Sequence, residues 1–147
     1  MLKILIAVDG SEHDKRSIDT VAKIANSSVL INAVLICVRS GALLEPLVAT
    51  DHYSEVTIQK INAEQAAEQT RVLESATAYA KTRGLLATES VPAYGSVAAE
   101  IIRVARERGV DMIAMGTRGM GTLGNLFLGS VAQKVVHLAP VPVVLSK

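Results

Sequence analysis

Glycines cluster between an apolar run and a stretch of helical periodicity near the end of this 147-residue chain. They are Gly116, Gly119, Gly121 and Gly124, with Gly129-Ser130 following where the helical pattern begins. A glycine-rich loop between a buried strand and a helix lets the backbone approach a ligand closely and direct N–H groups at it. Such a loop favours phosphate oxygens, so the sequence predicts a nucleotide site here.

Two other phosphate-binding motifs compete for this loop. The segment Gly119 to Gly124 matches G-x-G-x-x-G letter for letter. That dinucleotide fingerprint also requires an acidic residue about 20 positions further on to bind the ribose, and no Asp or Glu follows Asp111. A P-loop requires Gly-Lys-Ser or Gly-Lys-Thr, which occurs nowhere in the chain. The dinucleotide motif is therefore weakly supported, and the P-loop is excluded.

The charge around the loop favours an anionic ligand. After Asp111 the only side chains ionised at neutral pH are Arg118, Lys134 and Lys147, apart from His137 if it is protonated. The loop is therefore locally positive. The whole chain has a net charge of only +1 and no long block of like charge, so we expect no nucleic-acid partner.

A carboxylate is expected on the opposite side of the same site. The apolar run Leu2 to Val8 ends at Asp9-Gly10 and predicts a central buried strand with Asp9 at its carboxyl end. Ligands of open α/β sheets bind beyond the carboxyl ends of the strands. Asp9 can there accept hydrogen bonds from a ribose or adenine, or help to hold a metal. Alternatively, Asp9 accepts backbone N–H bonds at the start of the next helix.

Strand and helix signals alternate along the rest of the chain. Hydrophobic residues make up 50% of the sequence but aromatic residues only 3%, so the core must be aliphatic, as in a parallel sheet covered on both faces. We predict an α/β fold, a three-layer, doubly wound, five-stranded parallel sheet with four helices, in a single domain spanning residues 1–147. The expected elements after the first strand are a helix from about Glu12 to Ala25 opened by a capping box at Ser11 to Asp14, a strand at Leu30 to Val38, a helix at Ser54 to Arg83, a strand at Leu85 to Val91, a turn at Pro92 to Ser96, a helix capped by Ser96 and stopped by Gly109, a strand at Val110 to Met115, a last helix after Gly129, and a strand at Val141 to Leu145. The N-terminal N–H groups of the last helix would face the phosphates, with Ser130 as cap or as direct hydroxyl donor.

The composition also bears on localisation and on redox or metal chemistry. No apolar run approaches the length of about 18 residues that spans a membrane, and the start of the chain lacks the layout of a secretory signal. We expect a soluble, cytoplasmic protein without a membrane partner. Cys37 is the only cysteine, and the three histidines have no metal-ligand spacing, so no disulfide and no dedicated metal site are predicted.

The glycines also match a longer pattern. Gly116-x-x-Gly119, nine residues and then Gly129-Ser130 form the G-2x-G-9x-G-[S/T] motif, and the chain resembles the ATP-binding branch of the universal stress proteins. The resemblance runs nearly end to end, through Ile4 to Ser11, Gly95 to Gly119 and Ala139 to Leu145. It implies an adenine nucleotide alpha hydrolase-like, Rossmann-like fold with ATP as ligand and Mg²⁺ as its companion.

The resemblance also assigns roles to single residues. Asp9 would lie at the nucleoside end, and Val38 would present main-chain groups and an apolar side chain to adenine. Gly116, Gly119, Gly129 and Ser130 would surround the phosphates, with Thr117 and Arg118 as further candidates. Without the resemblance, Val38 is equally well the last core residue of its strand, and Arg118 an exposed loop arginine.

The predicted function is a nucleotide-dependent sensor or regulator of the stress response. Pro142 restricts the final strand, Val141 to Leu145, to an edge or to its own beginning, and an apolar edge strand invites pairing with a second copy. The family dimerises there, so a homodimer with an unknown protein partner is expected. A slow ATP hydrolase is one alternative, although Asp9 is the only obvious acid at the crevice. A structural or interaction dimer without nucleotide is the other.

Overall fold

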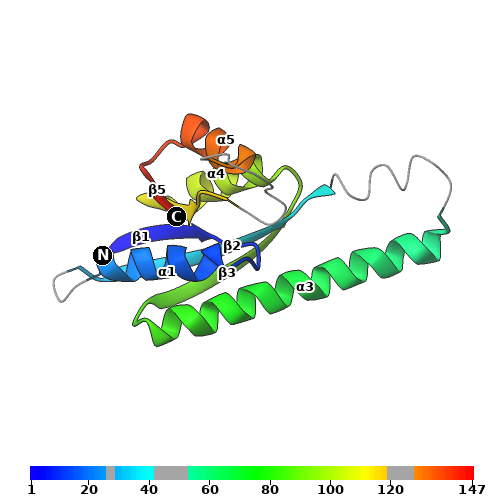
Figure 1. Ribbon diagram of the computed structural model, residues 1–147, viewed down its shortest axis with the longest axis horizontal. Helices are drawn as coiled ribbons and strands as arrows, with labels where there is room; N and C mark the ends of the chain where they lie inside the picture. The colour runs from blue at the N-terminus through cyan, green and yellow to red at the C-terminus, as the bar shows by residue number, and fades with distance from the viewer. Residues whose placement is uncertain (26–28, 42–52, 119–127) are drawn as a thin grey trace.

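The computed structural model describes residues 1–25, 29–41, 53–118 and 128–147, apart from the side chains of residues 87 and 88. Strands and helices alternate along these residues (Figure 1). In chain order they are β1 (Leu2–Ala7), α1 (His13–Ile24), β2 (Ile31–Arg39), α3 (Glu55–Thr82), β3 (Leu86–Tyr94), α4 (Val97–Glu107), β4 (Met112–Gly116), α5 (Ser130–Leu138) and β5 (Val143–Ser146).

The five described strands form one parallel sheet in the order β3-β2-β1-β4-β5. Ile4 in the central strand pairs with Ala33 of β2 on one side and with Met112 of β4 on the other. The chain first winds outward to β3 and then returns to β4 beside β1, so the direction of winding reverses between β1 and β4. Ligands of doubly wound sheets bind at this reversal, and the predicted fold class is confirmed.

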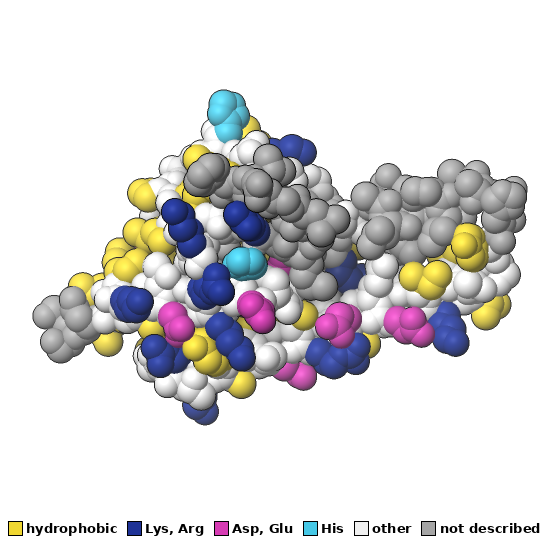
Figure 2. All heavy atoms as spheres, viewed as in Figure 1, with side chains coloured by type: hydrophobic (Ala, Val, Ile, Leu, Met, Phe, Trp, Pro, Cys, Tyr) yellow, Lys and Arg dark blue, Asp and Glu magenta, His cyan; other side chains and the backbone are white. Residues whose placement is uncertain are grey.

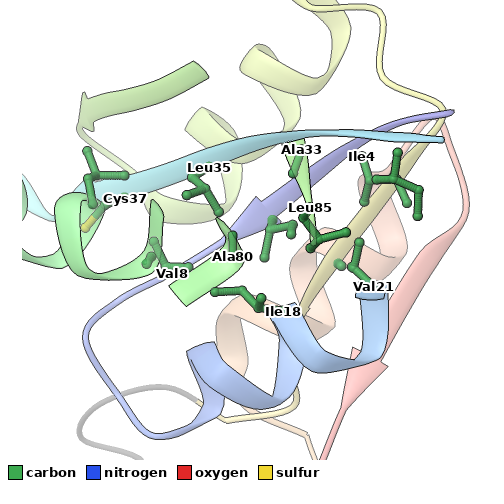
Figure 3. Close-up of a cluster of buried hydrophobic side chains, with 14 residues drawn as sticks. Ile4, Val8, Ile18, Val21, Ala33, Leu35, Cys37, Ala80 and Leu85 are labelled. Atoms are coloured by element: carbon green, nitrogen blue, oxygen red, sulfur yellow. The ribbon is translucent and has the colours of Figure 1, made fainter. Parts of the chain in front are cut away.

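Two aliphatic cores lie on the two faces of the sheet because successive strand residues point to opposite faces. Ile4 and Ile6 of β1 belong to the core beneath α1 and α3, shown in Figure 3, whereas Leu5 belongs to the core beneath α4 and α5. Full burial of such side chains contributes about 1.5–3 kcal/mol each. Both cores hold the strand ends in fixed positions, and the site depends on those ends.

The long helix α3 packs on the sheet through only part of its 28 residues. Its buried residues, Gln69, Leu73, Ala76 and Ala80, all lie in the C-terminal half. The N-terminal part extends beyond the sheet (Figure 1). The predicted helix from Ser54 to Arg83 is confirmed, with Ser54 as its N-cap accepting from the N–H of Thr57.

One strand boundary was predicted wrongly, and the reason is topological. The sequence predicts a turn from Pro92 to Ser96, but β3 continues through Pro92 to Tyr94. β3 lies at the edge of the sheet, where a residue without an N–H is tolerated. The final strand begins at Val143 rather than Val141, directly after Pro142, whose carbonyl accepts from the N–H of Ile113.

Candidate functional site

A cavity of about 680 Å³ lies at the carboxyl ends of β1 and β4, within the usual range for small-molecule sites. Seven of the eight predicted site residues line it: Asp9, Val38, Gly116, Thr117, Arg118, Gly129 and Ser130. The eighth, Gly119, lies outside the described residues. The topology therefore brings together residues from β1, β2, β4 and α5 that are far apart in the sequence.

The turn between β1 and α1 is held by carboxylates. Asp9 Oδ1 accepts from the N–H of Ser11 at 2.9 Å, so the predicted local role of Asp9 is present. The Asp14 carboxylate accepts from the N–H of Asp9 at 3.0 and 3.2 Å and from that of Gly10 at 2.7 Å. Gly10 has a φ of 86°, a left-handed conformation that favours glycine. These bonds fix the turn beside the cavity.

The predicted capping box at Ser11 to Asp14 is wrong. Glu12 is the N-cap residue of α1 and makes no side-chain capping bond. The Asp14 side chain instead accepts hydrogen bonds from the turn before the helix, because the N–H groups of Asp9 and Gly10 lie within hydrogen-bond distance of its carboxylate. Ser96 does occupy the predicted N-cap position of α4, although without a side-chain bond.

Burial raises the pKa of Asp14 to about 7, the N–H bonds from Asp9 and Gly10 lower it in part, and the nearby Asp9 carboxyl raises it. Near neutral pH Asp14 is therefore partly protonated. The turn then carries less negative charge than two ionised aspartates would give, which reduces its repulsion of an anionic ligand.

Main-chain bonds tie the end of β4 to β5 and α5. The N–H of Thr117 donates to the carbonyl of Ser146 at 2.9 Å, and the carbonyl of Thr117 accepts from the N–H of Gly129 at 2.7 Å. The amides of Thr117 and Gly129 are thus already engaged. Gly129, rather than Ser130, is the N-cap of α5, so of the two roles predicted for Ser130 the cap is wrong and the direct hydroxyl donor stays a prediction.

The first turn of α5 brings Val131 and Ala132 to the cavity. These two residues were not among the predicted site residues, although the N–H groups at the start of this helix were expected to face the phosphates. The first N–H groups of a helix have no partner within that helix, and Val131 and Ala132 line the cavity together with Ser130. In the sequence Val131 and Ala132 appear only as part of an apolar stripe. Their signal is positional, because they directly follow the Gly129 N-cap. The positive end of the helix dipole lies at the same place.

Gly116 is required by a close approach. A Cβ built on Gly116 would lie 2.8 Å from His13 Cβ and 3.0 Å from the main-chain oxygen of Arg118. The first residue of α1 therefore packs directly on the end of β4. This contact explains the first glycine of the motif by packing alone, and it adds His13 to the lining of the cavity.

Part of the cavity lining is apolar. This part includes Ile36, Val38, Val97, Ile101 and Met115. A flat aromatic base can bury its faces against such side chains.

The strand end beside Val38 is fixed by a group of polar residues that we call the α3 cluster, formed by Arg39, Asn62, Gln69 and Tyr94. Gln69 Nε2 donates to the carbonyls of Cys37 at 2.6 Å and Ala93 at 2.8 Å. Gln69 Oε1 accepts from Arg39 Nε at 3.1 Å, and the Arg39 guanidinium also donates to Asn62 and lies over the Tyr94 ring. This cluster attaches α3 to the ends of β2 and β3.

Other features of the described residues bear on cofactors and surroundings. Burial raises the pKa of the Cys37 thiol to about 11, so it is a neutral core group. Within the described ranges, no three His, Cys, Asp or Glu side chains come together as a metal site, and none of the described helices is long and apolar enough to cross a membrane. Figure 2 shows basic and acidic side chains interspersed along α1 and α3.

Comparisons with a family model and with individual proteins indicate the same family. The sequence model of the Universal stress protein family matches residues 1–147. The chain is 32% identical over 144 residues to Universal stress protein YxiE of Bacillus subtilis, covering 97% of each chain.

Solved structures share the fold. The structure of protein MJ0577 of Methanocaldococcus jannaschii superposes with a TM-score of 0.83 at 23% identity, covering 99% of this chain and 95% of that one. A universal stress protein family member from Arabidopsis thaliana, solved with AMP bound, superposes with a TM-score of 0.71 at 20% identity, covering 100% and 92%.

Proposed function

The chain belongs to the universal stress protein family, and from that premise we propose that it is an ATP-binding cytoplasmic homodimer that regulates a stress response according to its nucleotide occupancy. One observation carries the proposal. Seven residues predicted from the sequence and its family resemblance line a single cavity at the reversal point of the sheet. That is where the fold binds ligands.

The cavity offers a different chemistry for each part of ATP. The apolar side around Val38 and Ile101 suits adenine, and Asp9 can accept from ribose hydroxyls. The N-terminal N–H groups of α5, the Ser130 hydroxyl and Arg118 suit the phosphates. Mg²⁺ would accompany the phosphates without a dedicated cluster of ligand side chains among the described residues. The Arabidopsis relative solved with AMP supports an adenine nucleotide as ligand.

The homodimer would form through β5. This strand lies at one end of the sheet order, and its Val143, Val144 and Leu145 are only partly buried. Val136 and Leu138 of the preceding helix are 47% and 52% exposed. A second copy related by a two-fold axis would cover an apolar edge of this kind. The protein partner would then bind the dimer according to its nucleotide occupancy.

The first experiment identifies the nucleotide. Freshly purified protein is denatured, and released small molecules are analysed by chromatography and mass spectrometry. Emptied protein is then titrated with ATP and Mg²⁺ by calorimetry. We expect ATP or a related adenine nucleotide to be released and ATP to rebind with micromolar affinity, about −8 kcal/mol. ADP formed at many turnovers per minute would instead favour the hydrolase, and no release with no rebinding would contradict the proposal.

The Gly129→Val variant separates nucleotide binding from assembly. Gly129 has a φ of −68° and a ψ of 158°, which valine also adopts readily, so the fold and the dimer should persist. The added side chain would fill the cavity where α5 begins. We expect ATP binding to be abolished while sedimentation still shows a dimer. Unchanged ATP affinity would refute the assignment of the phosphate site.

A further inference from the structure

Two buried polar atoms beside the cavity lack a hydrogen-bond partner within the described part of the chain. They are Ser11 Oγ and His13 Nδ1, and both residues line the cavity. Buried polar groups in folded proteins are nearly always bonded, and each unpaired one costs about 1–3 kcal/mol. Two such atoms within three residues of each other indicate a polar ligand that supplies the missing hydrogen bonds.

His13 occupies a defined end of the cavity. It packs on Gly116, and the main-chain oxygen of Arg118 lies close to the same glycine. The imidazole therefore lies with β4 and the start of the glycine loop, and the apolar lining around Val38 belongs to the β2 side. The start of α5 is joined to the same strand end, because the N–H of Gly129 donates to the carbonyl of Thr117, and the phosphate donors of the proposed site lie in this first turn.

The charged groups around His13 are consistent with an anion at this end. Arg118 is the cation that lines the same cavity. The two nearby acids, Asp9 and Asp14, both accept main-chain N–H bonds in the β1–α1 turn. Their charge is therefore partly compensated by the turn.

We propose that His13 binds the phosphate chain of the nucleotide, with the Ser11 hydroxyl beside it, so that the first turn of α1 forms a wall of the phosphate site opposite α5. The proposal rests on the ATP binding proposed above. His13 Nδ1 donates in the Nδ1–H tautomer and in the imidazolium, and a donor to a charged phosphate oxygen makes a strong hydrogen bond. His13 would then distinguish nucleotides from nucleosides, a role that the glycine motif does not assign to this position.

The test compares ligands with and without phosphates. Emptied full-length wild type, His13→Ala, His13→Asn and the control His137→Ala are titrated with ATP and with adenosine by calorimetry. His137 is exposed in the last turn of α5, away from the cavity. We expect His13→Ala to weaken ATP binding by about 10-fold or more, as for loss of a charge-assisted hydrogen bond, and to leave adenosine binding unchanged. The amide of His13→Asn should restore part of the loss, and His137→Ala should match wild type.

A second readout addresses contact directly. The imidazole proton resonance of His13, identified by its absence in His13→Asn, should shift when ATP is added and not when adenosine is added. Equal shifts, equal losses for both ligands, or unchanged ATP affinity in His13→Ala would overturn the role of His13 while leaving the proposed function intact. Failure of the wild type to bind ATP would overturn both.

Discussion

Two groups of polar side chains meet the carboxyl end of the same sheet, and they differ in how their hydrogen bonds are satisfied. In the α3 cluster, both N–H groups of Gln69 and its oxygen are bonded within the chain. Ser11 and His13, which we call the α1 pair, have buried polar atoms without a partner among the described residues. The α3 cluster lies beside β2 and β3, and the α1 pair lies beside the cavity.

This difference separates a structural role from a ligand-binding one. A saturated buried network is rigid and specifies one arrangement of its elements, and here it fixes α3 on the strands that end beside Val38. An unsaturated group is costly in the folded protein alone, and a ligand removes that cost. Breaking the α3 cluster should therefore reduce stability, and disturbing the surroundings of the α1 pair should reduce binding.

Between these two groups, the largest effect is expected at the glycine that packs on His13. In Gly116→Val the new side chain would clash with His13 Cβ and with the main chain of Arg118, both at the proposed phosphate end. We expect ATP affinity measured by calorimetry to fall about 100-fold or more, or about 2.7 kcal/mol. Gly116→Ala, which adds only the Cβ, should show a smaller loss.

A matched glycine provides the control for that result. Gly84 has a φ of +78°, and an added Cβ would meet no atom within 4 Å. Gly84→Ala should therefore lower the free energy of unfolding by about 1 kcal/mol through backbone strain and leave ATP affinity unchanged. Wild-type affinity in Gly116→Val would contradict the close approach as the reason for this glycine.

The second effect concerns the saturated cluster. Gln69→Leu removes the donors to Cys37 and Ala93 and the acceptor of Arg39. We expect urea denaturation to show a loss of about 2 kcal/mol in the free energy of unfolding, while the folded variant binds ATP as the wild type does. Gln65→Leu makes the same change one turn earlier on α3 and should alter stability by less than about 0.5 kcal/mol. A loss of ATP binding without a loss of stability in Gln69→Leu would contradict the structural role proposed for the α3 cluster.

The last effect is a pH dependence arising from Asp14. The folded protein holds this proton up to about pH 7, whereas the unfolded chain releases it near the ordinary pKa of about 4. Since the unfolded state binds fewer protons in this window, stability contributed by this group decreases as the pH rises from about 4 to about 7. In Asp14→Asn this decrease should disappear, giving a flatter stability profile than wild type in urea denaturation between pH 5 and 7.5. Parallel profiles would show that Asp14 titrates normally.

Much of the fold follows from patterns within single segments. The run from Leu2 to Val8 and the stretch from Ser54 to Arg83 predict their strand and helix because apolar periodicity and the absence of Gly and Pro act locally. The turn at Pro92 was wrong because only the sheet order makes β3 an edge strand. The capping box at Ser11 was wrong because the Asp14 carboxylate accepts from the N–H groups of Asp9 and Gly10, which precede the helix.

The site shows the same division. The spacing of Gly116, Gly129 and Ser130 predicts where a phosphate-binding loop and helix meet. This could be predicted because glycines, which permit a close approach of the backbone to a ligand, are identified directly in the sequence. That the amides of Thr117 and Gly129 are already bonded, while Val131 and Ala132 of the next turn line the cavity, depends on how β4, β5 and α5 pack.

The sequence by itself determined the alternation of strands and helices, the aliphatic composition of the cores and the glycines that permit a nucleotide site, because these depend on local conformation and residue type. Only the tertiary structure decided that β4 returns beside β1, that His13 packs on Gly116 and that Asp14 is buried beside Asp9. The first two contacts join segments far apart in the chain, and the third depends on burial. Strand order and burial, which no local pattern encodes, decide which of these contacts form.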